Sequence, residues 1–263
     1  MLMPETPEPR LTPADITRVL VITLMLFFVF SLSATFLDEK IVLLIGELLL
    51  IVPAVLYVRA RRFPFFETFR LKPVQIGVLA STILLFLPVY VLTDELDRLI
   101  QHYFPMPDEW AQSIFELVRF SSWPQTLSIL AAGVVFAAFS EEMLFRGLVQ
   151  RSLEMIREPA AAIVSASVLF ALVHFNPWSS IQILLLGIVL GYVAWKSGSI
   201  LPSMLLHGLN NLLSILMINA PEESLHWYAE EFVRPYWVAA GVFLLIPTWR
   251  LFSDACRRQD ESS

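Results

Sequence analysis

The stretch Gly133-Val-Val-Phe-Ala-Ala-Phe-Ser-Glu141-Glu142-Met-Leu-Phe-Arg146-Gly147 places two adjacent carboxylates inside an apolar segment. The residues from 127 to 140, which precede the first glutamate, carry no charge at all. One acidic side chain at the centre of a membrane helix costs roughly 2.5–3.5 kcal/mol on insertion scales unless it is paired or hydrated. Two such side chains in a row therefore indicate a functional site, provided that the surroundings are a membrane.

The composition predicts those surroundings. The chain has 263 residues, of which 57% are hydrophobic and only 16% are charged, and its mean hydropathy is +0.68. Soluble domains are about 45–50% apolar and about 25% charged, so we expect a polytopic membrane protein with membrane lipid and no nucleic acid among its partners. The single cysteine, Cys256, excludes an internal disulfide and any zinc or iron–sulfur site built from several cysteines.

A membrane span needs about 20 mostly apolar residues. The hydropathy pattern predicts an all-α fold with about eight spans, preceded by a disordered tail over residues 1–16 that is rich in proline and acidic residues. The predicted spans cover residues 17–37, 41–58, 74–93, 125–150, 159–175, 179–196, 199–218 and 234–252.

The basic residues of the connecting segments predict the orientation. With the N-terminus inside, and Arg146 left out because it lies within a span, the inner segments hold 13 Lys and Arg residues and the outer segments hold 4. The positive-inside rule then places both termini in the cytoplasm. The inner residues are Arg10, Arg18, Arg59, Arg61, Arg62, Arg70, Lys72, Arg151, Arg157, Lys196, Arg250, Arg257 and Arg258, and the outer ones are Lys40, Arg98, Arg119 and Arg234.

Two connections have the composition of interfacial segments. Residues 59–72 alternate basic and aromatic side chains, which is typical of a segment lying on the inner membrane surface. Residues 94–119 are acidic and amphipathic, and we expect them to lie on the outer surface. Surface anchoring is the simpler interpretation of both segments, and substrate binding is the alternative.

Strongly polar groups recur at membrane depth in the second half of the chain. Residues four apart share a helix face, so Glu142 can reach Arg146, while Glu141 is turned away by roughly 100° and can face a cavity. Glu141 precedes Arg157 by 16 residues and His174 follows it by 17, which puts both about 25 Å from the inner end of a helical hairpin. His207, with Asn211 beside it on the same face, is expected nearer the inner surface unless its helix is tilted or starts deeper.

These groups could support hydrolysis without a serine or cysteine nucleophile. Glu141 and His174 could hold and deprotonate a water molecule, and His207 and Asn211 could donate hydrogen bonds to a developing oxyanion. Alternatively, Glu141, His174 and His207 could bind a metal ion. Each motif also has a simpler interpretation, because Glu142–Arg146 can be a structural ion pair, His207 and Asn211 can join helices, and Glu141 can relay protons in a transporter.

In this order and on hydrophobic helices, three motifs resemble those of the CAAX prenyl endopeptidase and bacteriocin-processing (CPBP, or Abi) family of intramembrane proteases. The motifs are Glu141-Glu142-x-x-x-Arg146, Phe170-x-x-x-His174 and His207-x-x-x-Asn211. The resemblance covers about residues 124–218. It implies an eight-span fold of the Ras-converting-enzyme type with a polar cavity inside the membrane, and peptide-bond hydrolysis by a glutamate-activated water.

Carried over by position, the resemblance makes Glu141 the general base and His174 its partner on the water, with His207 and Asn211 as the oxyanion hole. Glu142 and Arg146 would support the site. The chain lacks the His-Glu-x-x-His signature of zinc proteases, the Gly-x-Ser-x-Gly elbow of serine hydrolases and the Gly-x-Gly-Asp motif of aspartyl proteases. One or two glutamates and two histidines without a cysteine fit both a metal site and a glutamate mechanism. Between these two we favour the glutamate mechanism without a cofactor, with zinc as the alternative.

The sequence is thus interpreted as a cytoplasmic tail, an N-terminal membrane region (17–123), a catalytic core (124–218) and a last part comprising an outer loop, one helix and a tail (219–263). The expected partner is a peptide or protein substrate, which can be lipidated, and the expected location is the bacterial plasma membrane. A protein without enzymatic activity on the same fold, either a transporter or a bacteriocin-immunity protein, is the alternative function.

Overall fold

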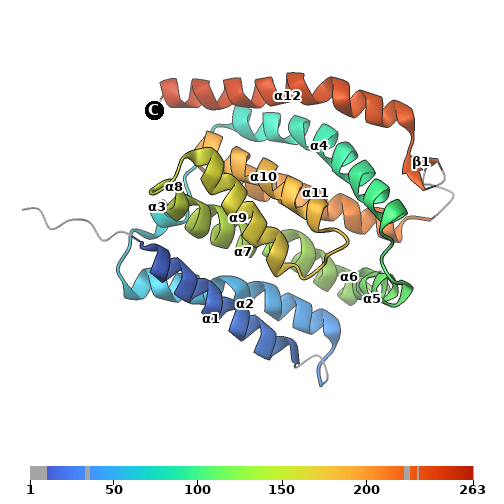
Figure 1. Ribbon diagram of the computed structural model, residues 1–263, viewed down its shortest axis with the longest axis horizontal. Coiled ribbons are helices and arrows are strands. Elements are labelled where there is room, and N and C mark those ends of the chain that lie inside the picture. Colours follow the sequence, from blue (N-terminus) through green and yellow to red (C-terminus); the bar gives the residue numbers. More distant parts are fainter. Residues whose placement is uncertain (1–10, 33–35, 222–225, 230, 263) are drawn as a thin grey trace, which may run out of the picture.

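The structure is a computed structural model that describes residues 11–32, 36–221, 226–229 and 231–262. Long helices run side by side along one direction, and a short antiparallel hairpin of β1 (Tyr228–Ala229) and β2 (Phe232–Val233) precedes the last of them (Figure 1). The long helices are α1 (Pro13–Ser31), α2 (Glu39–Ala60), α4 (Ile76–Tyr103), α9 (Pro159–Val173), α10 (Ser180–Ser197), α11 (Leu201–Asn219), α12 (Pro235–Glu261), and a continuous rod made of α6 (Trp123–Leu130), η2 (Ala131–Phe136), α7 (Ala137–Glu142), η3 (Met143–Gln150) and α8 (Arg151–Glu154).

The predicted all-α membrane fold is confirmed. Among the described residues, seven helices are long and apolar enough to cross a membrane, and the rod over residues 123–154 is one of them. The remaining predicted span, residues 159–175, corresponds to α9, a shorter apolar helix of 15 residues. At 1.5 Å per residue it extends about 22 Å, which is less than a typical hydrocarbon core of about 30 Å.

The bundle has three layers (Figure 1). Helices α1 and α2 pack together on one side, α4 and α12 on the other, and the rod, α9, α10 and α11 lie between them. One apolar cluster joins α1 and α2 to η3 and α9, and a second joins α4 and α12 to α10 and α11. The central layer is therefore covered on both sides, which removes its polar groups from lipid.

The disordered tail predicted for residues 1–16 is wrong at its end, because α1 already begins at Pro13. The Thr12 side chain accepts a hydrogen bond from the Asp15 backbone, and the Asp15 carboxylate accepts one from the Thr12 backbone at 2.9 Å. This reciprocal cap stabilises the first turn, and proline at the first helical position suits it. Residues 1–10, the rest of the predicted tail, lie outside the described residues.

Two predicted span ends are also wrong. The first span was expected to reach residue 37, but α1 ends at Ser31. Asp38 caps the start of α2 by accepting from the Lys40 backbone at 2.9 Å, and residues 33–35 lie outside the described residues. The third was expected to stop at residue 93, but α4 continues to Tyr103. The charged residues in this extension of α4 are paired. Asp94 forms a salt bridge with Arg98 at 3.5 Å, and the Arg98 guanidinium donates to the Glu231 carbonyl at 3.0 Å.

The segment from 59 to 72 was predicted to lie on the membrane surface, and this is only partly correct. Phe66 is exposed, but Phe69 is fully buried in the first apolar cluster, beside α3 (Phe65–Thr68). Arg70 is buried too and forms a salt bridge with Glu154 at the end of the rod. The segment therefore closes one end of the bundle. The other connection holds α5 (Asp108–Val118), a helix with no buried residue.

Candidate active site

The two adjacent glutamates lie in α7, between two stretches of π-helix, η2 and η3. Such wide turns are rare and occur frequently at functional sites. The side chains diverge as the helical spacing predicts. Glu142 is fully buried and accepts a hydrogen bond from Arg146 at 2.8 Å, so the predicted contact between them is confirmed. Glu141 instead lines a pocket of about 350 Å³.

The Arg146 guanidinium has three neighbours that fix its position. Besides Glu142, it donates to the Gly187 carbonyl of α10 at 3.1 Å and lies 4.2 Å from the centre of the Phe170 ring of α9. It is 1% exposed, so these contacts lie away from bulk solvent. A buried cation held by a carboxylate, a carbonyl and an aromatic face is well compensated, and it joins the rod to both neighbouring helices.

His207 reaches both glutamates. Its Nδ1 lies 3.0 Å from Oε1 of Glu142, and its Nε2 lies 3.9 Å from Oε2 of Glu141. The expected mismatch in depth is absent because α11 starts within the protein: Ser199 and Ile200 are fully buried. The Ile200 backbone N–H donates to the Arg70 carbonyl at 3.1 Å, so the segment from 59 to 72 covers the start of the helix.

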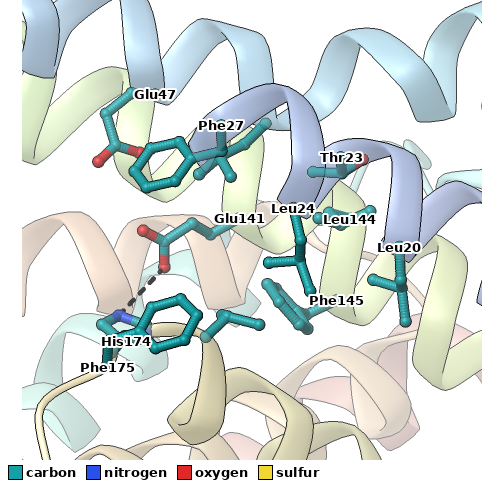
Figure 2. Close-up of a pocket in the computed structure, with 12 residues that line it drawn as sticks. Leu20, Thr23, Leu24, Phe27, Glu47, Glu141, Leu144, Phe145, His174 and Phe175 are labelled. Carbon is teal, nitrogen blue, oxygen red and sulfur yellow. Dashed lines mark ion pairs between the residues drawn. The ribbon is translucent and has the colours of Figure 1, made fainter. Parts of the chain in front are cut away.

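His174 lies at the level of Glu141, as predicted. Its Nε2 is 3.8 Å from Oε2 of Glu141, the contact drawn as a dashed line in Figure 2. Its Nδ1 is 2.7 Å from the Phe170 carbonyl oxygen, which can only accept, so Nδ1 carries the hydrogen. In the neutral ring Nε2 is then an acceptor that faces the carboxylate. Two acceptors at this separation suit a water molecule that donates one hydrogen to each.

Asn211 is placed differently from the expectation. Its amide donates to the Gly133 carbonyl of η2 at 2.8 Å, and its side-chain oxygen lies 3.4 Å from the amide of Asn210. One of its two amide hydrogens therefore joins α11 to the rod, and the other remains for a further acceptor. The role of Asn211 in an oxyanion hole stays a prediction.

Several residues at the site were not identified from the sequence. Gln150, one turn after Arg146, donates to the Gly191 carbonyl at 2.9 Å, just as Arg146 donates to Gly187. A Cβ at Gly191 would lie 2.7 Å from Oε1 of Gln150. The sequence feature that could have revealed these contacts is the small-residue motif Gly187-x-x-x-Gly191, which permits close approach of membrane helices. Its four-residue spacing equals that of Arg146 and Gln150.

The pocket beside Glu141 is lined largely by apolar side chains of α1, α2 and η3 (Figure 2). Its volume is within the range of small-molecule and peptide side-chain sites. Glu47 of α2, the one acidic residue within the first three predicted spans, also lines it. The lining residues are Leu20, Thr23, Leu24, Phe27, Glu47, Leu50, Glu141, Leu144, Phe145, Val173, His174 and Phe175.

The alternative of a zinc site needs three ligands around one point. Among the described residues, no group of three His, Cys, Asp or Glu side chains is arranged to hold a metal ion. Glu141, His174 and His207 come closest through the two contacts to Oε2 of Glu141, but Nδ1 of His207 is already engaged by Glu142. As they stand, these side chains do not fit a metal centre, and we derive no step through one.

The comparisons with known proteins bear on the same segment. Residues 123–213 match the family model of Rce1-like type II CAAX prenyl endopeptidases. No curated protein and no solved structure matches the chain. The matched residues amount to about a third of the chain and include all six predicted site residues. This segment is therefore similar to the Rce1-like type II CAAX prenyl endopeptidases, and the match supports the resemblance to the CPBP family.

Proposed function

We propose that the protein is an intramembrane endopeptidase that hydrolyses a peptide bond of a membrane-associated substrate with a water activated by Glu141. One observation carries the proposal. Oε2 of Glu141 is buried without a hydrogen-bond partner and faces Nε2 of two histidines, at 3.8 and 3.9 Å. A buried carboxylate oxygen without a partner costs free energy, and a bound water would satisfy it.

In the first step, the water donates its hydrogens to Glu141 and to Nε2 of His174, which leaves its lone pair free for the substrate. Glu141 takes one proton as the water oxygen bonds to the scissile carbonyl carbon, and the carbonyl π electrons move to the oxygen. The C–N bond then breaks, and the proton held by Glu141 passes to the leaving nitrogen. Atoms and charges balance without any further reactant.

The negative oxygen needs hydrogen-bond donors. Because Nδ1 of His207 faces the Glu142 carboxylate, Nε2 can donate only if the ring carries both protons. The proposal therefore requires the ring to carry both protons when the oxyanion forms. The free amide hydrogen of Asn211 is the second donor in this proposal. Glu142 and Arg146 act on the reaction through His207, as positioning residues.

The test replaces Glu141 with glutamine, which has nearly the same shape but cannot take a proton. We expect Glu141→Gln to abolish cleavage and to leave substrate binding largely intact. Membranes from cells that express the wild type or the variant are compared by proteomics for a peptide cleaved only by the wild type. The control is Glu39→Gln, the same change at an exposed position of α2.

Near-normal cleavage by Glu141→Gln would show that the catalytic assignment is wrong. A protein that cleaves nothing, but whose expression makes transport depend on a proton gradient and on Glu141, would support the transporter alternative instead.

A further inference from the structure

The side of the pocket formed by α1 and α2 presents polar atoms that the proposed reaction does not use. Oγ1 of Thr23 and Oε2 of Glu47 are buried and have no hydrogen-bond partner. Both residues line the same pocket as Glu141. Buried polar atoms without partners cost about 1–3 kcal/mol each, and two of them on one pocket wall indicate a ligand that satisfies both.

Thr23 is unusual among the hydroxyl side chains of these helices. Threonine in a membrane helix normally donates to the carbonyl one turn earlier, as Thr17 of the same helix does to Pro13 at 3.0 Å and Thr82 does to Val78 at 2.8 Å. Thr23 is 1% exposed and makes no such bond. Its hydroxyl is therefore available to the pocket.

Glu47 has no cation to neutralise it within the pocket. None of the described residues that line the pocket is a lysine or an arginine. The nearest buried cation of the site, Arg146, is already bound to Glu142 and Gly187. In the view of Figure 2, Glu141 lies between Glu47 and His174, so two carboxylates flank the space where a substrate side chain would enter.

Phe27 completes the environment. The aromatic ring lines the pocket beside Glu47. Its position depends on Gly46, because a Cβ there would lie 3.2 Å from the ring. The face of an aromatic ring attracts a cation, while the leucines that line the pocket suit a methylene chain.

We propose that this pocket is the subsite for a lysine or arginine side chain of the substrate, with Glu47 as its ion-pair partner. This proposal rests on the proposed peptidase function. The apolar walls accept the aliphatic stem of such a side chain, Phe27 faces its cationic group, and Thr23 provides a further acceptor. The substrate is therefore a membrane segment with one basic residue close to the bond that is cleaved.

The first experiment measures binding to the full-length Glu141→Gln protein, in which Glu47 is the one carboxylate left among the described lining residues. The probes are synthetic apolar helices of about 20 residues that differ in one residue, Lys or Gln, moved along the helix. We expect the Lys peptide to bind about tenfold more tightly at one or more positions, as for a hydrogen bond to a charged group. Adding Glu47→Gln should remove the preference, and adding Glu39→Gln should not.

Charge reversal and the threonine give independent measurements. Glu47→Lys should reverse the preference, so that a Glu peptide binds better than a Lys peptide. Thr23→Val should weaken binding of the Lys peptide about two- to tenfold, whereas Thr17→Val, an exposed change on the same helix, should have no effect. Equal binding of Lys and Gln peptides at every position would overturn the proposal, even if none of the Glu47 variants folds.

The two proposals fail in different ways. If the Glu141→Gln protein prefers Lys peptides but the wild type cleaves none of them, the subsite stands and the peptidase function is wrong. If the wild type cleaves Lys and Gln peptides at equal rates, and Glu47→Gln leaves these rates unchanged, the peptidase stands and the subsite is wrong.

Discussion

Glu141 and Glu142 are neighbours in sequence but have different chemical environments. Glu142 is fully buried and bound by Arg146 and His207, so its charge is used inside the protein. Glu141 faces the pocket and keeps an oxygen without a partner. Because the helix turns roughly 100° per residue, two identical side chains have different surroundings. The motif predicts this divergence, and our proposal assigns the chemical role to Glu141.

Arg146→Ala should therefore act on folding as well as on activity. It removes the cation beside a carboxylate that is 0% exposed, and breaking a buried ion pair by removing one partner costs about 3–5 kcal/mol. We expect a lower yield of folded protein and a lower melting temperature, measured by size-exclusion chromatography and thermal denaturation in detergent. Arg146→Lys keeps the charge but loses the forked contact to Gly187, and it should be intermediate. Normal yield with no activity would place Arg146 in the chemistry.

Asn211→Ala tests the second oxyanion donor. Loss of one such donor typically lowers kcat by about 10²–10³ with little change in KM, because the bond strengthens only in the transition state. If the amide serves only to join α11 to Gly133, the substitution should lower the melting temperature and leave kcat of the remaining folded protein nearly unchanged. Steady-state kinetics with a defined peptide, together with a thermal melt, distinguishes the two roles.

The metal question has a direct measurement. We expect chelator-treated, purified protein to remain active and to contain no stoichiometric zinc, since the side chains around Glu141 do not form a three-ligand site among the described residues. About one zinc per chain, with activity lost on chelation and restored by zinc, would contradict this. Glu141, His174 and His207 would then be the ligands, after a rotation of the histidines.

At the scale of elements, the close approach of α10 to the rod depends on glycine. A Cβ at Gly191 would lie 2.7 Å from Gln150 and 2.9 Å from Ile163, so these side chains or the helices that carry them must shift to admit it. Gly147 has a similar role toward the segment from 59 to 72, since its Cβ would lie 2.9 Å from the Phe69 carbonyl oxygen. Gly147 is next to Arg146 in the rod, and Gly191 lies one turn from Gly187, which accepts from Arg146. We therefore expect a shift of the backbone at either glycine to move the Arg146 guanidinium.

We expect Gly191→Ala to lower stability by about 1–3 kcal/mol, the usual effect of overpacking. The matched control is Gly77→Ala in α4, where a Cβ meets nothing within 4 Å. That change should be neutral or slightly stabilising, because alanine is the better helix former. Thermal melts of the two variants in the same detergent provide the comparison. Equal melting temperatures would show that α10 can move away from the rod without loss.

The same elements show what the sequence predicts and what it does not. Hydropathy located every long helix, and spacing located the Glu142–Arg146 contact and the common level of Glu141 and His174. Neither hydropathy nor spacing predicted that the start of α11 is buried, because this burial depends on the segment from 59 to 72 folding over the helix. The unpartnered oxygens of Thr23 and Glu47 were equally hidden, since satisfaction of a polar group is a property of packing.

At the scale of the whole molecule, the number of crossings decides where the two ends lie. The start of α1 and the end of α12 are at the same end of the bundle (Figure 1), as an even number of crossings requires. This arrangement depends on α9, which is short for a span. One face of it packs against the rod and α10, so the protein rather than lipid contacts that face. Such burial allows a helix of 15 residues to complete the path.

Both ends should therefore lie on the same face of the membrane, and the 13 basic residues of the inner segments against 4 of the outer ones make that face the cytoplasmic one. After Arg258, we expect activity from a reporter that works only in the cytoplasm and none from a reporter that works only after export. After Pro105, between α4 and α5, we expect the opposite result. If α9 did not cross, the fusion after Arg258 would report the outer side while an N-terminal fusion still reported the cytoplasm. If instead all the assignments were reversed, the charge rule would be wrong for this chain, and substrate would reach Glu141 from the opposite face.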